Sequence, residues 1–261
     1  MEALDELLDC ENMDRRNFIL ISGTTLTSSL LAWLTADPVA AGQIAGGRRI
    51  GESAVAHVEG RVRHLRLADD ADGGEHLITE AAASLQLVTA ILKDRCYVDA
   101  HGARLHAAAA DLTRMTAWGT FDVKDVCADA VFDAALRAAQ AASDPALGAH
   151  VLAFWAIAAY NTGRPGDADS MLSAALAAVR GRTAPRVEAM LYSRRARARA
   201  HLGDPRCWHD IVLASNRMDA ASDGDEDPEW VYWFDRAELL GAIASTHRDC
   251  GQPAQAEQEF A

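Results

Sequence analysis

Hydrophobic residues recur every three to four positions along the chain from residue 50 onward. This spacing gathers side chains on one face of an α-helix, whereas a half-buried strand would alternate every second residue. The pattern therefore predicts an all-α fold of amphipathic helices, one of them spanning about His76 to Tyr97. The residues of the first two apolar faces are Ile50, Ala54, Val58, Val62 and Leu65, and then Leu77, Ala81, Leu85, Val88 and Leu92.

A second, longer pattern returns about every 40 residues. In each copy a small residue precedes a large apolar one by four positions, and another small residue follows three positions later, so all three share one helical stripe. The copies are Ala128, Phe132 and Ala135; Ala168, Leu172 and Ala175; Cys207, Ile211 and Ala214; and finally Ala256 and Phe260. The step to the last copy is longer because an acidic loop, Asp219–Glu229, is inserted before it.

Glycine and proline mark the start of the last three stripes. They occur as Gly163-Arg-Pro, Gly203-Asp-Pro and Gly251-Gln-Pro. Glycine readily ends a helix in the left-handed conformation, and proline is favoured in the first turn of the next helix. Each glycine is therefore expected to end the first helix of a pair. These first helices are expected at about 145–162, 186–202 and 229–250.

Helix pairs of this kind cannot bury their apolar faces alone, so successive pairs must stack. Alanine is the most frequent residue, and it allows helices to approach closely. The sequence thus predicts a right-handed α-α superhelix, a solenoid of stacked antiparallel helix pairs over residues 50–261, with an incomplete last repeat. In the helix at 229–250, the buried stripe is expected to hold Trp230, Trp233, Ala237, Leu240, Gly241 and Ala244.

The residues before the repeats allow two interpretations. Arg15-Arg16 and the apolar stretch that follows resemble a twin-arginine export signal, but six acidic residues precede or flank the arginines, where such a signal carries positive charge. We therefore favour an N-terminal extension at 1–13, a docking helix at 14–34 and a linker at 35–49. Export by the twin-arginine route is the alternative. Hydroxyl residues and a glycine interrupt the apolar stretch, which makes it a poor membrane span.

The small–large–small stripes with Gly-x-Pro between helices are similar to tetratricopeptide repeats (TPR). Several phrases further resemble actinobacterial transcriptional regulators that carry a helix-turn-helix domain followed by a TPR-like half. These phrases are Asp14-Arg-Arg-Asn-Phe-Ile through Ala32-Trp33-Leu34, and the segments Asp144–Val151, Ala200–Asp204 and Trp230–Glu238. The resemblance implies a cytoplasmic, TPR-like regulatory module without the DNA-binding domain, because only thirteen residues precede Asp14.

The net charge and the motifs of the chain argue against several classes of function. A net charge of −13 disfavours direct binding to nucleic acid, which requires clustered basic side chains. The five cysteines are widely spaced and are expected to be buried thiols, and the histidines lack the HExxH spacing of a zinc site. No phosphate-binding loop and no nucleophile elbow is present. We expect no metal, no cofactor and no catalysis, with an enzyme that uses an unrecognised acid/base site as a remote alternative.

One basic cluster stands out, formed by Arg194, Arg195, Arg197 and Arg199. Two interpretations remain open for it. The commoner outcome is a solvated helix face that pairs with Glu188 and other nearby acids. The alternative is recognition of a carboxylate on a partner peptide or protein, which suits the planar guanidinium.

A ligand of such a solenoid would lie in the concave groove lined by the first helices. The candidate groove residues are His150, Tyr160, Asn161, Ser193, Arg197, His201, Glu238, Ser245 and Arg248. Exposure in the groove is expected above all for Tyr160, Asn161, Arg197, His201 and Arg248. The sequence thus favours a module that binds a protein or peptide, and dimerisation through the terminal helices is a further expectation.

Overall fold

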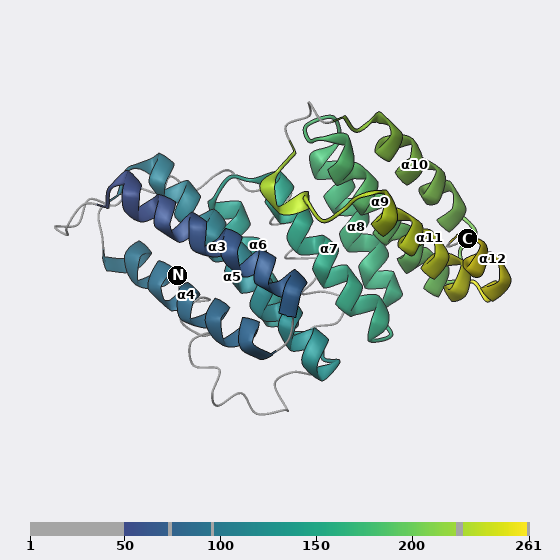
Figure 1. The fold of residues 1–261 in the computed structure, drawn as a ribbon, viewed down its shortest axis with the longest axis horizontal. Helices are drawn as coiled ribbons and strands as arrows, with labels where there is room; N and C mark the ends of the chain where they lie inside the picture. The colour runs from purple at the N-terminus through teal and green to yellow at the C-terminus, as the bar shows by residue number, and fades with distance from the viewer. Residues whose placement is uncertain (1–49, 73–74, 95–96, 223–226, 260–261) are drawn as a thin grey trace. The chain divides into compact units, whose positions relative to one another are not determined.

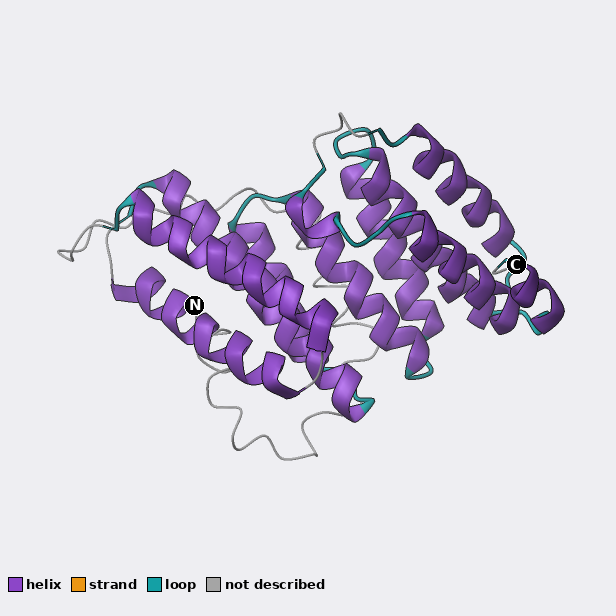
Figure 2. Cartoon of the chain, in the orientation of Figure 1, coloured by secondary structure: helices purple, strands orange, loops and turns teal. Residues whose placement is uncertain are grey.

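The computed structural model describes residues 50–72, 75–94, 97–222 and 227–259 (Figure 1). Every regular element in these ranges is a helix, which confirms the all-α prediction (Figure 2). The predicted extension, docking helix and linker at 1–13, 14–34 and 35–49 lie outside the described residues. The chain divides into two compact units, Met1–Val151 and Leu152–Ala261.

The first unit is built around α5, which packs against α3, α4 and α6. Its helices are α3 (Glu52–Asp72), α4 (Glu75–Asp94), α5 (Asp99–Lys124), α6 (Asp129–Ala141) and the start of α7 (Pro145–Asn161). Two of them carry the apolar faces expected from the sequence. All the predicted inward residues of α4 are buried, namely Leu77, Ala81, Leu85, Val88 and Leu92. Three of the five residues predicted for the apolar face that begins at Ile50 are also buried, namely Val58, Val62 and Leu65.

Helices α4 and α5 approach closely because α5 is rich in small residues. A methyl group built on Gly119 of α5 would lie only 2.7 Å from Cγ1 of Ile78 on α4, so this position has no room for a larger side chain without a shift of Ile78. Three consecutive alanines of the same helix, at 108–110, are also buried. Small side chains at helix crossings thus have the role that the alanine content indicated.

The second unit is organised around α9, which packs against α8, α10 and α11 (Figure 1). Helix α11 also contacts α10 and α12. The elements that follow α7 are α8 (Pro165–Val179), α9 (Pro185–His201), α10 (Cys207–Ala220), the 3₁₀ turn η3 (Glu229–Val231), α11 (Arg236–Asp249) and α12 (Pro253–Gln258). None of the helices that the structure describes is both long and apolar enough to cross a membrane.

The three predicted glycine breaks are confirmed. Gly163, Gly203 and Gly251 follow α7, α9 and α11 with φ angles of 83°, 67° and 74°, in the left-handed region that favours glycine. The backbone N–H after each glycine donates to the carbonyl five residues earlier, at 2.8–2.9 Å. These bonds satisfy carbonyls that the helix end would otherwise leave without a partner.

Helix α6 ends in the same geometry without a glycine. Ser143 there has a φ of 58°, and the N–H of Asp144 donates to the carbonyl of Ala139 at 3.2 Å. The Asp144 carboxylate then accepts from the N–H of Leu147 at 2.9 Å and so caps the first turn of α7. This helix break carries no Gly-x-Pro signal, but it lies where the predicted helix at 145–162 begins.

The small–large–small stripes are buried as expected in the first two copies. Ala128, Phe132, Ala135, Ala168, Leu172, Ala175, Cys207 and Ala214 are buried. Ile211 and Ala256 are only half-buried, and Phe260 lies outside the described residues. The stripe is therefore weakest in the last copy.

The prediction of one continuous helix over 229–250 is wrong. The segment forms η3, a turn, and then α11, which begins only at Arg236. The cause is Asp235, whose carboxylate accepts the N–H of Glu238 at 2.9 Å and starts a new helix in a new rotational phase. Of the predicted stripe, Trp230 and Ala244 are buried, Trp233 and Gly241 are half-buried, and Ala237 and Leu240 are exposed. The other buried residues of α11 are Leu239, Ala242 and Thr246.

We expect Gly203→Ala to destabilise the protein by about 1–2 kcal/mol, because a Cβ is unfavourable at a positive φ. Gly241→Ala is the matched control, since Gly241 lies inside α11 with open space around its Cα. Alanine there should stabilise the helix by up to about 1 kcal/mol. Urea unfolding of both variants checks this, and effects of equal sign would contradict the assignment of Gly203 to a left-handed helix end.

Candidate functional site

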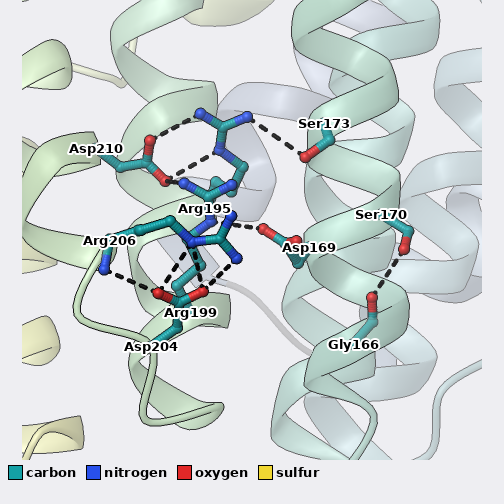
Figure 3. A network of polar contacts seen from close by, with 9 residues as sticks. All are labelled: Gly166, Asp169, Ser170, Ser173, Arg195, Arg199, Asp204, Arg206 and Asp210. Atoms are coloured by element: carbon teal, nitrogen blue, oxygen red, sulfur yellow. Dashed lines mark hydrogen bonds and ion pairs between the residues drawn. The ribbon is translucent and has the colours of Figure 1, made fainter.

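The arginines of α9 lie on two faces of that helix, and one face holds a buried acid. Asp210 of α10 is 0% exposed. Its carboxylate accepts two hydrogen bonds from Arg195, from Nε at 3.0 Å and Nη2 at 2.7 Å, and a third from Nη1 of Arg199 at 2.9 Å (Figure 3). Arg195 and Arg199 are four residues apart, so they project from the same side of α9.

The same two arginines also reach α8. Nε of Arg199 donates to Asp169 at 2.8 Å, and Nη1 of Arg195 donates to the Ser173 hydroxyl at 3.4 Å (Figure 3). The two guanidinium groups thus bridge a carboxylate on α10 and polar groups on α8. We call Asp169, Arg195, Arg199 and Asp210 the Asp210 network.

The other face of α9 carries Arg197 and His201, which meet Asp249 at the end of α11. Nε and Nη2 of Arg197 donate to Oδ2 of Asp249 at 3.0 and 2.8 Å, and Nε2 of His201 lies 3.3 Å from the same oxygen. Arg248 reaches the other oxygen, Oδ1, from Nη2 at 3.1 Å. One carboxylate therefore stands among three basic side chains.

Tyr160 of α7 completes this group. Its ring stacks on His201 with centroids 5.1 Å apart, and the guanidinium carbon of Arg197 lies 5.1 Å from the centre of the same ring. Nη1 of Arg197 donates to the Tyr160 hydroxyl at 3.3 Å. We call Tyr160, Arg197, His201, Arg248 and Asp249 the Asp249 cluster, which draws on α7, α9 and α11.

The Asp249 cluster carries a surplus of positive charge. Partial burial lowers the pKa of His201, and the attraction of Asp249 offsets this only in part, so the imidazole is neutral at pH 7. Two arginines then face one carboxylate. The Arg248 side chain is 64% exposed, and the neighbouring Asn161 at the end of α7 is exposed as well. The surplus charge is therefore accessible to solvent.

The structure brings together four of the nine candidate groove residues: Tyr160, Arg197, His201 and Arg248. Of the others, Glu238 is exposed and Ser245 is half-buried on α11. Asn161 donates from its amide to the carbonyl of Ile157 at 2.9 Å. These three residues are not part of the Asp249 cluster.

The predicted exposure of Tyr160 is wrong, because this side chain is 2% exposed. The groove candidates His150 and Ser193 are also buried, at 1% and 0% exposed. The Ser193 hydroxyl turns back onto the carbonyl of Met190 at 2.8 Å, so it serves its own helix. Tyr160 is covered by the side chains that stack on its ring. It therefore packs beneath them and is not part of a surface.

As the commoner expectation had it, Arg195, Arg197 and Arg199 pair with nearby acids, but their side chains are only 10–15% exposed and so do not form a solvated face. Glu188, another expected partner, accepts from Nε of Arg217 on α10 instead, at 2.7 Å. Arg194 lies over the ring of Trp233, 5.5 Å from its centre. Each of the four arginines thus has an acidic or aromatic partner, and Arg195 and Arg199 share Asp210.

Sequence reasoning missed the two acids that organise this region, Asp210 and Asp249. Asp210 follows the small residue Cys207 by three positions and therefore lies beside the buried stripe of α10. An acid at such a position, next to an arginine-rich helix, is a usable signal for a buried ion pair. Asp249 carried no comparable signal, because it ends its helix.

His150 belongs to a different cluster, in the first unit. Asp111 of α5 is buried and accepts from Nε of Arg66 at 2.6 Å and Nε of Arg114 at 2.7 Å, while Nε2 of His150 lies 4.0 Å away. Burial alone would raise the pKa of Asp111, but Arg114 and Arg66 hold it well below its usual range. Burial lowers the pKa of His150 well below its ordinary value, and the charge of Arg114 adds to this.

Within the described ranges, no three side chains of His, Cys, Asp or Glu come close enough together to hold a metal ion. Searches for similar proteins found no matching family model, no matching curated protein and no matching solved structure. The arrangement of the Asp249 cluster itself therefore carries the functional argument.

The lowered pKa of His150 predicts a pH dependence of stability. Below about pH 6.5 the unfolded chain binds a proton at this histidine and the folded chain does not, so folding loses stability as the pH falls. We expect the free energy of unfolding to decline by about 1 kcal/mol per pH unit from this group below that pH. Urea titrations between pH 7 and pH 5 measure it.

Two variants of the first unit separate the contribution of His150 to this pH dependence from that of another histidine. His150→Gln should have a shallower pH slope than the natural chain, whatever its stability at pH 7. His64→Gln changes an exposed histidine of α3 and should leave the slope nearly unchanged. Equal slopes for all three proteins would show that His150 does not stay neutral in the folded state.

Proposed function

We propose that the chain is a non-catalytic, TPR-like module that binds a protein or peptide partner through a surface centred on the Asp249 cluster. The observation that carries the proposal is that residues expected in a groove from spacing alone, Arg197, His201 and Arg248, converge on one carboxylate at the ends of α9 and α11. Tyr160 at the end of α7 supports them. In a TPR-like superhelix, these three helices would be the successive first helices that line the concave side.

The chemistry of the cluster suits an acidic partner. Its two arginines outnumber its one carboxylate, in a chain whose net charge is −13. A carboxylate of a partner could join Asp249 between the guanidinium groups or take its place, and forked N–H donors match such a ligand well. Exposed Arg248 would make the first contact, because Arg197 is partly covered by its neighbours.

The partner would be a protein rather than a nucleic acid. A strongly acidic chain is repelled by phosphate backbones unless it has an extended basic surface. The resemblance to regulators with a TPR-like half adds the proposal that the module acts in transcriptional control in the cytoplasm, through another protein that contacts DNA.

The binding proposal is tested by selecting peptides from a displayed random library on the purified full chain. We expect the selected peptides to be enriched in Asp and Glu, and Arg248→Glu to weaken their binding by at least about tenfold, since a charge-assisted contact contributes about 1.5–3 kcal/mol. Fluorescence anisotropy with a labelled selected peptide gives the Kd of each variant.

Arg236→Glu is the matched control for this experiment. It makes the same substitution on the same helix, at a side chain that is 71% exposed and that pairs with Asp219. The control should bind like the natural chain. Selection of peptides without acidic residues, or equal weakening by both substitutions, would contradict a role for the Asp249 cluster in recognition.

A further inference from the structure

Two cysteines far apart in the sequence meet in the second unit. Cys207 is the first residue of α10, and Cys250 follows the last residue of α11. Their sulfur atoms are 3.9 Å apart, and both are free thiols. Cys207 packs with Ala196 and Ala200 of α9, and Cys250 lies against this group.

The two sulfurs are in contact but not bonded. The S–S bond of a disulfide is about 2.05 Å long, so the two sulfurs need to approach by about 2 Å. Cys250 is the residue directly after α11 and precedes Gly251. Gly251 lies outside the helix and has a φ of 74°, in the left-handed region that favours glycine. Bond formation would require rotation of the two side chains and an adjustment at this helix end.

We propose that Cys207 and Cys250 are a redox modification site that closes to a disulfide when the protein meets a hydroperoxide. The inference does not depend on the proposed function. The Cys250 thiolate attacks one peroxide oxygen, the O–O bond breaks, and the other oxygen leaves and takes up a proton as water or alcohol. The sulfur of Cys207 then attacks the sulfenic acid of Cys250, and the S–O bond breaks as the S–S bond forms. The released hydroxide takes the Cys207 proton and leaves as water, so the two thiols lose two electrons in all.

The two cysteines have different roles in this sequence. Cys207 is buried, and this burial, with the nearby sulfur of Cys250 adding to it, raises the pKa of Cys207 to about 12. It therefore remains a thiol at neutral pH. Cys250 is only half-buried and is the sulfur that peroxide can reach. Cys250 is thus the attacking residue, and Cys207 resolves the sulfenic acid.

The bond would link α10 to the end of α11. Both helices contact one another already, and the cross-link would close a loop that includes the acidic segment between them. Closing a loop restricts the unfolded chain and so stabilises the folded one. The oxidised form should therefore unfold at a temperature several degrees higher than the reduced form.

The test treats the full chain with hydrogen peroxide and then maps its peptides without reduction. We expect a linked pair of peptides that contain Cys207 and Cys250, an intact mass lower by two hydrogen atoms, a higher Tm, and reversal of all three by dithiothreitol. Cys127→Ser is the matched control, because Cys127 is a buried thiol of the first unit that donates to Asp129 instead. This variant should form the same link.

Two further variants separate the roles of the two cysteines. Cys207→Ala should let peroxide oxidise Cys250 to the sulfinic acid without a cross-link, and Cys250→Ser should leave Cys207 unmodified. Recovery of the Cys250 peptide only as sulfinic acid in the natural chain would overturn the proposal. So would cross-links of Cys250 to Cys10 or Cys96 instead, or the absence of any oxidation.

Discussion

The ion pair of Asp210 with Arg195 and Arg199 is the interaction on which the second unit depends. A carboxylate with no exposure to solvent is costly unless its charge is fully compensated, and here two guanidinium groups supply three hydrogen bonds to it. The requirement fixes how α9 is turned about its own axis. Because Arg199 also binds Asp169, the same requirement fixes α8 relative to α9.

The candidate site follows from this rotation. Successive residues of a helix are about 100° apart, so a face that carries Arg195 and Arg199 leaves Arg197 and His201 on another face. That second face meets α11 and Tyr160, and there the arginine is shared between a carboxylate, a phenol hydroxyl and an aromatic ring. A row of arginines that looks uniform in the sequence thus has one part that joins α9 to α8 and α10 and another part that joins it to Tyr160 of α7 and to α11.

The sequence predicts the local structure of this protein better than its contacts. Periodicity identified the buried face of α4 residue by residue, and the glycines at 163, 203 and 251 located three helix ends, because both signals act within a few residues. The rotational phase of α11 was not predictable by extending one stripe, since a single hydrogen bond at Asp235 restarted the helix. Spacing placed Arg197, His201 and Arg248 among the groove candidates, and the structure brings these three side chains to one carboxylate. Spacing could not identify Asp249 as their shared partner, because the position of an acid across a helix interface depends on packing between distant segments.

The Asp210 network keeps α9 and α10 in order, and native-state hydrogen exchange tests this most directly. Asp210→Ala removes the partner of two arginines that are largely buried, a loss of about 3 kcal/mol or more. We expect the protection of the α9 and α10 amides to fall on the order of 100-fold, while that of α4 and α5 is kept. Asp219→Ala, which removes an exposed acid, should leave α9 and α10 unchanged. Unaltered protection of α9 and α10 in Asp210→Ala would contradict this role of the Asp210 network.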